Sequence, residues 1–183
     1  VPGIHNVSNA LAALATSLEL GIDADTAARG LSMFHGTNRR VQYKGEGNGF
    51  TIIDDYAHHP TEIKATLSSA EGMKDKHIVA VFQPHRYTRL KNLWNEFLDA
   101  FGGVDKVYVT DVYAASEDAI EGINSENFVK ELSSHVDCEY ISGSIKDVAK
   151  NLYPKLNEND VVIGLGAGTI TNLGKELLSV KDE

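Results

Sequence analysis

From about residue 60 onward, short apolar segments alternate with amphipathic ones, and this alternation constrains the fold more than any other feature. Residues 77–83, "HIVAVFQ", form a continuous apolar run of the kind that parallel sheets bury on both faces. Between Leu90 and Phe101, apolar side chains recur at helical spacing. Strands separated by helices of about 10–15 residues are typical of parallel sheets with right-handed crossovers. The sequence therefore predicts an α/β fold: a Rossmann-like, mostly parallel sheet with flanking helices.

The rest of the chain fits this plan, with one exception at its beginning. Strands are expected at 77–83, 106–113, 138–142 and 160–166, after two strands joined by a glycine-rich turn within 41–56. Helices are expected at 60–70, 90–101, 124–134, 145–156 and 169–180. Two earlier helices, at 6–20 and 25–34, lie outside the alternation and are predicted to finish a preceding domain. We therefore expect the opening residues to come from the middle of a longer protein.

The composition argues against several functional classes. The formal net charge is -9, whereas nucleic-acid binding normally needs a clustered basic face. The single cysteine, Cys138, cannot form an internal disulfide or a thiolate metal site, which fits a reducing cytoplasm. No apolar run approaches the roughly 18 residues of a membrane span, and no signal peptide opens the chain. We therefore expect a cytoplasmic protein that binds neither nucleic acid nor membrane.

Polar clusters follow four of the expected strands. They are Asp54 to His59, Gln83 to Arg89, Asp111 with Tyr113, and Gly164 to Gly168. In open α/β sheets, ligands bind beyond the carboxyl ends of the strands. Because all four clusters fall on one predicted edge of the sheet, together they indicate a binding site more strongly than any one of them does alone.

The second cluster continues as "QPHRYTRLK" and places His85, Arg86, Arg89 and Lys91 in a short segment of an acidic protein. Arginine guanidinium groups bind carboxylates and phosphates through paired hydrogen bonds. The alternative is a solvated loop that starts a helix. The position directly after a buried strand favours anion binding.

The adjacent histidines His58 and His59 raise the question of a metal site. Adjacent side chains normally point in different directions, and no third or fourth ligand stands at a familiar spacing, so we expect no metal site. Hydrogen bonding by His58, or proton exchange with a bound group, fits better. Pro60 is expected to begin a helix, whose free N–H groups attract an anion.

The glycine-rich turn "GLGAG", residues 164–168, has two interpretations. It resembles a dinucleotide-binding turn, but its spacing is G-x-G-x-G and no acidic residue about 20 positions further on can be assigned to a ribose. A tight turn required by strand–helix packing explains it equally well. The chain also lacks a P-loop, because Gly174 and Lys175 are followed by Glu176. An ATP triphosphate would have to be held elsewhere.

Six motifs, in this order, resemble the Mur ligase family. They are "GIHNVSNALAA" (3–13), "NRR" (38–40), "DDYAHHPTEIKATL" (54–67), "FQPHRYTR" (82–89), "DVYAASE" (111–117) and "GAGTI" (166–170). The resemblance covers nearly the whole chain. It implies that residues 1–38 end a central, ATP-binding domain and that residues 39–183 form a C-terminal Mur ligase domain.

The resemblance implies an ATP-dependent acid–amino-acid ligase of peptidoglycan synthesis. Such an enzyme joins L-alanine to UDP-N-acetylmuramate through an acyl phosphate. ATP and Mg²⁺ would be held mainly by N-terminal and central domains outside this chain, so the chain alone is expected to be inactive.

Three other functions stay open. A murein-peptide recycling ligase of the same family would share "DDYAHHPTE", and a non-catalytic nucleotide-binding α/β module would fit "GLGAG". A metal hydrolase using His58, His59 and His85 would contain stoichiometric metal, which metal analysis of the purified chain tests.

The resemblance also implies roles for residues near the domain boundary. His5, Asn6 and Asn9 resemble the central-domain edge of an adenine pocket. Either Arg39 or Arg40 resembles the arginine that reaches ATP; we assign Arg40 a catalytic role and Arg39 a cofactor-binding role, with the choice between them left open.

For the first polar cluster, Asp54 and Asp55 resemble the nucleotide contact on the hinge side. His58 resembles a catalytic partner of the nucleotide or phosphate. The chain departs from the family pattern at Thr169, where an aspartate is common, and at Val41, where a phenylalanine is common, so no role is assigned to either position.

For the second cluster, His85, Arg86 and Arg89 resemble the group that receives the incoming amino acid and the muramyl carboxylate. Tyr113 is expected to line the same site. In a chain of net charge -9, such a local grouping of cations indicates an anionic substrate.

Overall fold

The computed structural model describes residues 4–34, 36–70, 73 and 75–180, with the backbone alone for Ile4 and His5. The chain divides into two compact units, Val1–Asn38 and Arg39–Glu183, and each is described by itself. That the first unit belongs to an ATP-binding domain stays a prediction.

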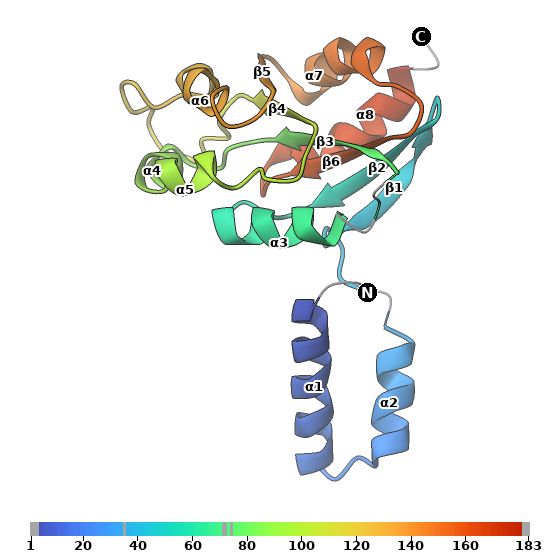
Figure 1. Cartoon of the computed structure of the whole chain (residues 1–183). Helices are drawn as coiled ribbons and strands as arrows, with labels where there is room; N and C mark the ends of the chain where they lie inside the picture. The colour runs from blue at the N-terminus through green and yellow to red at the C-terminus, as the bar shows by residue number, and fades with distance from the viewer. Residues whose placement is uncertain (1–3, 35, 71–72, 74, 181–183) are drawn as a thin grey trace. The chain divides into compact units, whose positions relative to one another are not determined.

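The first unit consists of two helices, α1 (Ile4–Glu19) and α2 (Ala24–Ser32), close to their predicted positions (Figure 1). Asp23 caps α2, because its side chain accepts a hydrogen bond from the Thr26 N–H at 2.9 Å. Among the described residues, none before Arg39 belongs to a buried apolar core. The core of the chain therefore lies in the second unit.

The second unit is built on a six-stranded sheet. In chain order the strands are β1 (Gln42–Gly47), β2 (Phe50–Asp55), β3 (His77–Phe82), β4 (Lys106–Thr110), β5 (Cys138–Ile141) and β6 (Asp160–Leu165). Their order in the sheet is β1-β2-β6-β3-β4-β5, and only the β1–β2 pair is antiparallel. The prediction of a mostly parallel sheet is confirmed.

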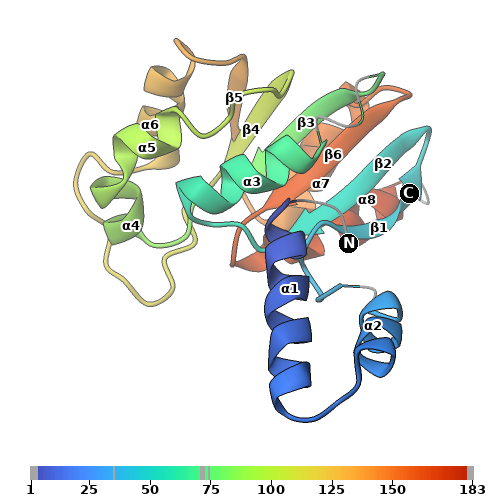
Figure 2. The same ribbon diagram turned by 60° about the horizontal axis from the view of Figure 1, so that its bottom comes forward.

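Helices cover both faces of this sheet (Figure 2). One layer consists of α3 (Pro60–Ala70), α4 (Tyr87–Asn92), α5 (Trp94–Leu98) and α6 (Ser125–Leu132). The other consists of α7 (Ile145–Leu152) and α8 (Leu173–Val180), with 3-10 turns at Tyr153–Lys155 and Thr169–Asn172. The predicted flanking helices are thus present, in two layers.

The strands supply both layers because successive side chains point to opposite faces of a sheet. Ile53 packs with the first layer, whereas its neighbour Ile52 packs with the second. Phe82 and Val81 divide in the same way on β3. A strand that buries both faces needs a continuous apolar run, and this explains the runs of apolar residues in β3 and β6.

Besides the 3-10 turns within the helices expected at 145–156 and 169–180, two expected elements differ from the structure. The helix expected at 90–101 is two short helices, because Leu93 between them has φ -120° and ψ 26°. Apolar spacing does not reveal the break, since Leu90 before it and Phe97 after it pack into the same core. The strand expected at 106–113 ends at Thr110, and Tyr113 pairs with His85 only as an isolated bridge.

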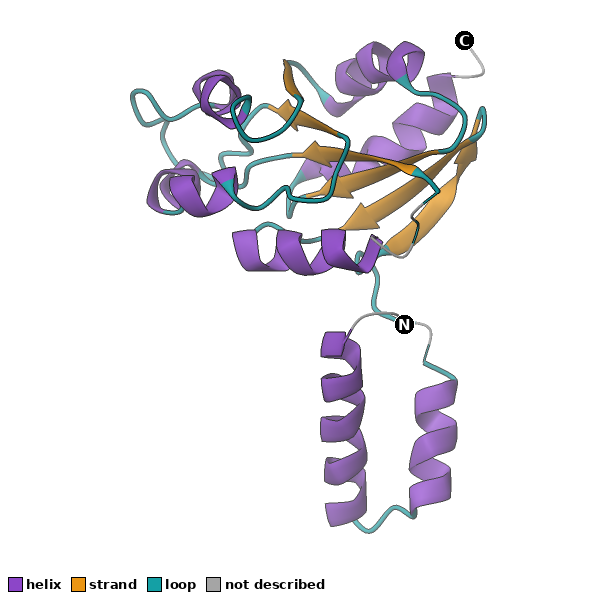
Figure 3. Ribbon diagram, viewed as in Figure 1, coloured by secondary structure: helices purple, strands orange, loops and turns teal. Residues whose placement is uncertain are grey.

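The last strand, β6, decides where the site lies. It pairs with β2 on one side and β3 on the other, although both precede it by many residues. The chain leaves β2 and β3 toward one helical layer and leaves β6 toward the other. Such a switch point opens a place for a ligand at the carboxyl ends of the strands, where loops follow the arrowheads (Figure 3).

We expect Phe82→Ala to lower the free energy of unfolding by about 3–5 kcal/mol, because it leaves a cavity in the first layer. Phe82 is fully buried, with ring centroids 5.4 Å from Phe97, 5.3 Å from Phe101 and 6.4 Å from Phe128. Urea unfolding measures the change. Tyr43→Ala, at an exposed position of β1, should change stability by less than about 0.5 kcal/mol; equal losses in the two variants would contradict this core.

Candidate functional site

The structure brings together three of the four polar clusters that the sequence places at strand ends, and part of the fourth. The His58 and His85 rings, from the loops after β2 and β3, have centroids 5.8 Å apart. The His85 ring stacks on Tyr113 at 5.3 Å, with 19° between the ring planes. A Cβ atom added to Gly168, after β6, would lie 2.6 Å from Cγ of Tyr113. The loops after β2, β3, β4 and β6 therefore meet in one cluster at this edge of the sheet.

Arg39 is held by contacts at the end of β2. Its Nη2 donates a hydrogen bond to the Gly166 carbonyl at 2.6 Å, and its Nε lies 3.4 Å from Oδ2 of Asp54. The same Oδ2 accepts a hydrogen bond from the Thr171 hydroxyl at 2.8 Å. The guanidinium also lies over the Tyr56 ring, 4.8 Å from its centroid. Arg39 and Asp54 thus fasten the β2 loop to the turn after β6.

Asp55 is buried, and its carboxylate contacts backbone N–H groups. Its two carboxylate oxygens accept hydrogen bonds from the N–H groups of Val41 and Ala57, each at 2.7 Å. Burial raises the pKa of Asp55, although these hydrogen bonds oppose the rise. This geometry supports a positioning role for Asp55 rather than a direct contact with a nucleotide. Val41 holds Asp55 through its backbone N–H, while its side chain packs against the core of the first layer.

Arg40 is the more available of the two arginines, since its side chain is 52% exposed against 22% for Arg39. Its Nη2 lies 3.9 Å from Oε1 of Glu62 on α3. The other oxygen of Glu62 accepts hydrogen bonds from the N–H groups of His58 at 3.1 Å and His59 at 3.3 Å. Glu62 thereby links Arg40 to the loop that bears His58.

Sequence reasoning missed Glu62, although its position offered a signal. An acidic residue in the first turn of a helix, just after Pro60, commonly accepts hydrogen bonds from the residues before the helix. Burial alone would raise the pKa of Glu62, but the His58 N–H and the charges of His58 and Arg40 lower it overall. Glu62 is therefore an anion at neutral pH.

His85, in the loop after β3, is held by Arg89 on α4. Nη1 of Arg89 lies 3.1 Å from Nδ1 of His85 and donates to the His85 carbonyl at 3.0 Å. Burial lowers the pKa of His85, and the charges of Arg89, His58 and Arg86 lower it further. The ring is therefore neutral at neutral pH and acts as a hydrogen-bonding group.

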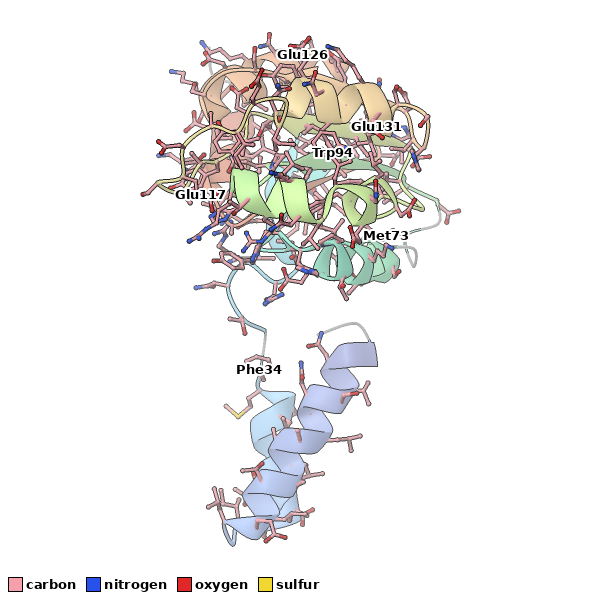
Figure 4. The ribbon with its side chains drawn as sticks, turned by 90° about the vertical axis from the view of Figure 1, so that its left-hand side faces the viewer. Phe34, Met73, Trp94, Glu117, Glu126 and Glu131 are labelled. Atoms are coloured by element: carbon pink, nitrogen blue, oxygen red, sulfur yellow. The ribbon has the colours of Figure 1, made fainter. Side chains whose placement is uncertain are left out.

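Arg86 has a constrained backbone and an available side chain. Its φ of 74° is rare for a residue other than glycine, and its N–H donates to the Tyr113 carbonyl at 2.8 Å. Its half-exposed guanidinium lies 3.7 Å from Oε1 of Glu117. Glu117 in turn accepts hydrogen bonds from the hydroxyl and the N–H of Thr88, at 2.6 and 3.0 Å. In Figure 4, side-chain nitrogen atoms gather beside Glu117.

Glu117 is a second residue that sequence reasoning left without a role, although it stands in the "DVYAASE" segment. Hydrogen bonds from Thr88 lower its pKa, and the charge of Arg86 adds to this effect. Loop 111–123 contains no regular element, so nothing in its pattern showed that Glu117 returns to the start of α4.

The glycine turn after β6 is packed against the neighbouring loop. A Cβ atom on Gly168 would lie 2.5 Å from Oε1 of Gln83, and one on Gly166 would lie 2.9 Å from the Gln83 carbonyl. Gln83 also bonds the turn through its side chain, to Oγ1 of Thr169 and from the Ile170 N–H, both at 3.0 Å. These contacts favour the packing interpretation of "GLGAG", and they give Thr169 a role as a hydrogen-bond acceptor.

The chain matches the family described as "Mur ligase, glutamate ligase domain" over residues 39–168. The chain belongs to the Mur ligase family. Among curated relatives, the UDP-N-acetylmuramate–L-alanine ligases of Brucella anthropi and Caldicellulosiruptor bescii are 48% and 46% identical to it. These matches cover 97% and 93% of this chain, but 39% and 37% of the relatives.

Solved Mur ligase structures agree with this placement. The UDP-N-acetylmuramate–alanine ligase of Thermotoga maritima is similar with a TM-score of 0.80 and 30% identity, over 100% of this chain and 39% of that one. The murein peptide ligase of Psychrobacter arcticus has a TM-score of 0.69 at 24% identity and shows the fold alone. This Mur ligase chain thus spans about two fifths of the length of the relatives it matches.

Three predicted residues of this Mur ligase chain lie in the first unit. Asn6 and Asn9 are part of α1, and the side chain of His5 lies outside the described residues. Their contact with adenine stays a prediction. Within the described part of the chain, no group of three or more His, Cys, Asp or Glu side chains could hold a metal ion. Nor does any described helix have the length and apolarity to cross a membrane.

We expect Gly168→Ala to destabilise the chain by about 1–3 kcal/mol, because the new methyl group would overlap Gln83 and Tyr113. Thermal unfolding measures the loss. Gly102→Ala is the matched control, since a Cβ atom there meets nothing within 4 Å. A loss no larger than that of the control would contradict the packing of the glycine turn.

The lowered pKa of His85 predicts how stability depends on pH. In the unfolded chain His85 binds a proton below about pH 6.5, whereas in the folded chain it does so only at lower pH. The unfolded state therefore binds more protons in this window, and stability is lost as the pH falls through it. Melting temperatures across this range should fall less steeply in His85→Gln than in the surface variant His135→Gln; parallel curves would contradict the prediction.

Proposed function

We propose that this chain is the C-terminal part of an ATP-dependent ligase that joins L-alanine to UDP-N-acetylmuramate in peptidoglycan synthesis. The observation that carries the proposal is the set of cationic side chains at the carboxyl edge of the sheet. Arg40 and Arg86 are half exposed there, next to the His58 and His85 rings, in a chain of net charge -9. Its relatives at 46–48% identity bear the name of this ligase.

The chemistry of this ligase explains the need for such cations. A carboxylate resists attack by an amine, because it is already negative and oxide is a poor leaving group. Phosphorylation by ATP makes an acyl phosphate, from which phosphate departs when the amine attacks. The triphosphate, the carboxylate and the acyl phosphate concentrate negative charge, which arginine side chains and helix N-termini offset.

The roles that we propose for these residues follow from how exposed their side chains are. Arg40 faces phosphate groups and His58 faces the amine that attacks the acyl phosphate, while Arg86 and His85 receive the carboxylates of L-alanine and of the muramyl group. Arg89 has an indirect role, because it holds the His85 ring and carbonyl in place. Arg39, Asp54 and Asp55 keep the β2 loop in place, as their buried contacts favour.

Further parts of the proposal concern groups outside this chain. When bound, ATP supplies the phosphoryl group, and Arg40 is a side chain that could contact its phosphates. Mg²⁺ in such enzymes is held by one or two carboxylates together with waters and substrate phosphates, and the described residues offer no cluster of three or more His, Cys, Asp or Glu side chains that would bind it without those phosphates. We propose that Mg²⁺, the P-loop and the UDP-sugar are held by the N-terminal and central parts of a longer cytoplasmic enzyme, with Asn6 and Asn9 at its adenine pocket.

The test uses the full-length enzyme to which we assign this chain. With ATP and UDP-N-acetylmuramate, we expect phosphate release that depends on L-alanine, and none from residues 1–183 alone. Arg86→Ala should lower kcat/KM about a hundredfold or more, because a charge-stabilising donor is lost. Lys91→Ala, an exposed cation of the same segment, is the matched control.

Three outcomes would contradict the proposal or part of it. Turnover by residues 1–183 alone would show that the missing domains are not needed. Near-normal kinetics of Arg86→Ala would remove that residue from the site. Ligation of a murein peptide in preference to L-alanine would assign the chain to the recycling ligase instead.

A further inference from the structure

The two histidines of the site are held with their protons on opposite nitrogens. Nδ1 of His58 lies 2.9 Å from the Tyr56 carbonyl oxygen. A carbonyl oxygen only accepts hydrogen bonds, so Nδ1 of His58 must bear the hydrogen. In the neutral ring, Nε2 then has a free lone pair. His58 therefore presents a hydrogen-bond acceptor and a base.

His85 is held in the opposite form. Nη1 of Arg89 lies 3.1 Å from Nδ1 of His85, and a guanidinium only donates hydrogen bonds. Nδ1 of His85 must then be the acceptor, which leaves the hydrogen of the neutral ring on Nε2. Among the hydrogen bonds of the described residues, none uses Nε2 of either ring. One ring thus offers an acceptor and the other a donor.

Glu62 holds His58 in this arrangement. Its Oε2 accepts from the His58 N–H at 3.1 Å and lies 3.4 Å from Nδ1 of the same ring. Its Oε1 lies 3.9 Å from the Arg40 guanidinium. An anion beside Nδ1–H favours this tautomer and stabilises the ring when Nε2 takes up a proton, as carboxylates do for histidine bases in other enzymes.

Two further titratable side chains lie near the His58 ring, one from the loop after β3 and one from its own loop. His85, in the loop after β3, faces it at 5.8 Å between ring centroids, and Tyr56 of its own loop at 5.0 Å. The charges of Arg89 and Arg86 lower the pKa of His85, and Arg89 contacts the His85 ring. Glu62 is therefore the anion in closest contact with the His58 ring among the described residues.

We propose that Glu62 is a positioning residue that acts through His58, whose Nε2 accepts a proton from the ammonium group of the incoming amino acid. The inference rests on the proposed ligase function and deepens it. His85, with its hydrogen on Nε2, can donate a hydrogen bond to the carboxylate of that amino acid. An amino acid, with an ammonium and a carboxylate on one carbon, has the complementary pair of groups.

The proton balance of the proposed step closes. The ammonium group gives one proton to Nε2 of His58, and the neutral amine attacks the carbonyl carbon of the acyl phosphate. The C–N bond forms as the bond from carbon to the phosphate oxygen breaks. The second proton that nitrogen loses passes to the departing phosphate, and His58 returns its own proton to solvent. No oxidant, reductant or further reactant is needed.

The tautomers can be read directly from the chain without any ligand. Nitrogen-15 NMR of the histidine rings in mildly alkaline solution should show His58 with hydrogen on Nδ1 and His85 with hydrogen on Nε2. In Glu62→Gln we expect His58 to show both forms, because the amide nitrogen can donate to Nδ1. Glu126→Gln is the matched control, because Glu126 on α6 (Figure 4) is likewise paired with a residue four positions away in sequence. That residue is Lys130, at 3.2 Å.

The catalytic part is tested in the full-length enzyme with two nucleophiles. We expect Glu62→Gln to lower kcat with L-alanine about tenfold at neutral pH, with a smaller loss as the pH rises and free amine becomes abundant. Hydroxylamine is already neutral at neutral pH, so hydroxamate formation from UDP-N-acetylmuramate and ATP should be unchanged. Glu126→Gln should match the unmodified enzyme with both nucleophiles.

Each contrary result has a distinct meaning. Hydrogen on Nε2 of His58 in the unmodified chain would overturn the inference at its base. Equal losses with both nucleophiles at every pH would reduce Glu62 to a structural role and overturn the proton transfer. Absence of amide formation by the unmodified full-length enzyme would instead reject the proposed function, and with it the proton transfer, while the NMR result would still judge the tautomers.

Discussion

The parallel pairing of β6 between β2 and β3 is the constraint on which the rest of the site depends. It places Asp54 opposite Gly164 on one side and Phe82 opposite Leu165 on the other. The loops that follow these residues must then share one edge of the sheet. Because β6 is the last strand, residues more than a hundred positions apart, such as Asp54 and Gly164, must meet before this edge is complete. The contact from Arg39 to Gly166 depends on the same pairing.

At this edge of the sheet, each of three arginines lies next to one carboxylate. Asp54 is the partner of Arg39, Glu62 of Arg40 and Glu117 of Arg86, at 3.4, 3.9 and 3.7 Å. The first pair is largely buried, whereas the other two arginines are half exposed. A buried charge needs its partner to avoid the cost of desolvation, but an exposed one can exchange its partner for a ligand at little cost. The difference in burial separates the structural arginine from the two that suit an anion.

The backbone at this site is held in uncommon conformations. Arg39, Val41 and Arg86 all have positive φ values, of 60°, 47° and 74°. Such conformations cost free energy in residues with a Cβ atom, and they persist only where the surroundings hold them. Here the holding contacts are visible: the Asp55 carboxylate binds the Val41 N–H, and the Tyr113 carbonyl binds the Arg86 N–H. The segments that provide the cations are thus held in place by hydrogen bonds to the rest of the fold.

The sequence by itself predicted the class of fold, which the structure confirms, and the edge of the sheet at which we propose the site. Apolar runs and helical spacing are local properties, so they predicted the strands, the flanking helices and the edge at which His58, His85 and Arg86 gather. The partners of these residues could not be predicted, because a single side chain does not record which distant segment it will meet. Tertiary structure alone decided that Arg39 is largely buried against Asp54 while Arg40 is half exposed, that Glu62 and Glu117 pair with arginines of the candidate site, and that the glycine turn packs on Gln83. These contacts depend on the insertion of β6 and on the return of loop 111–123 to α4.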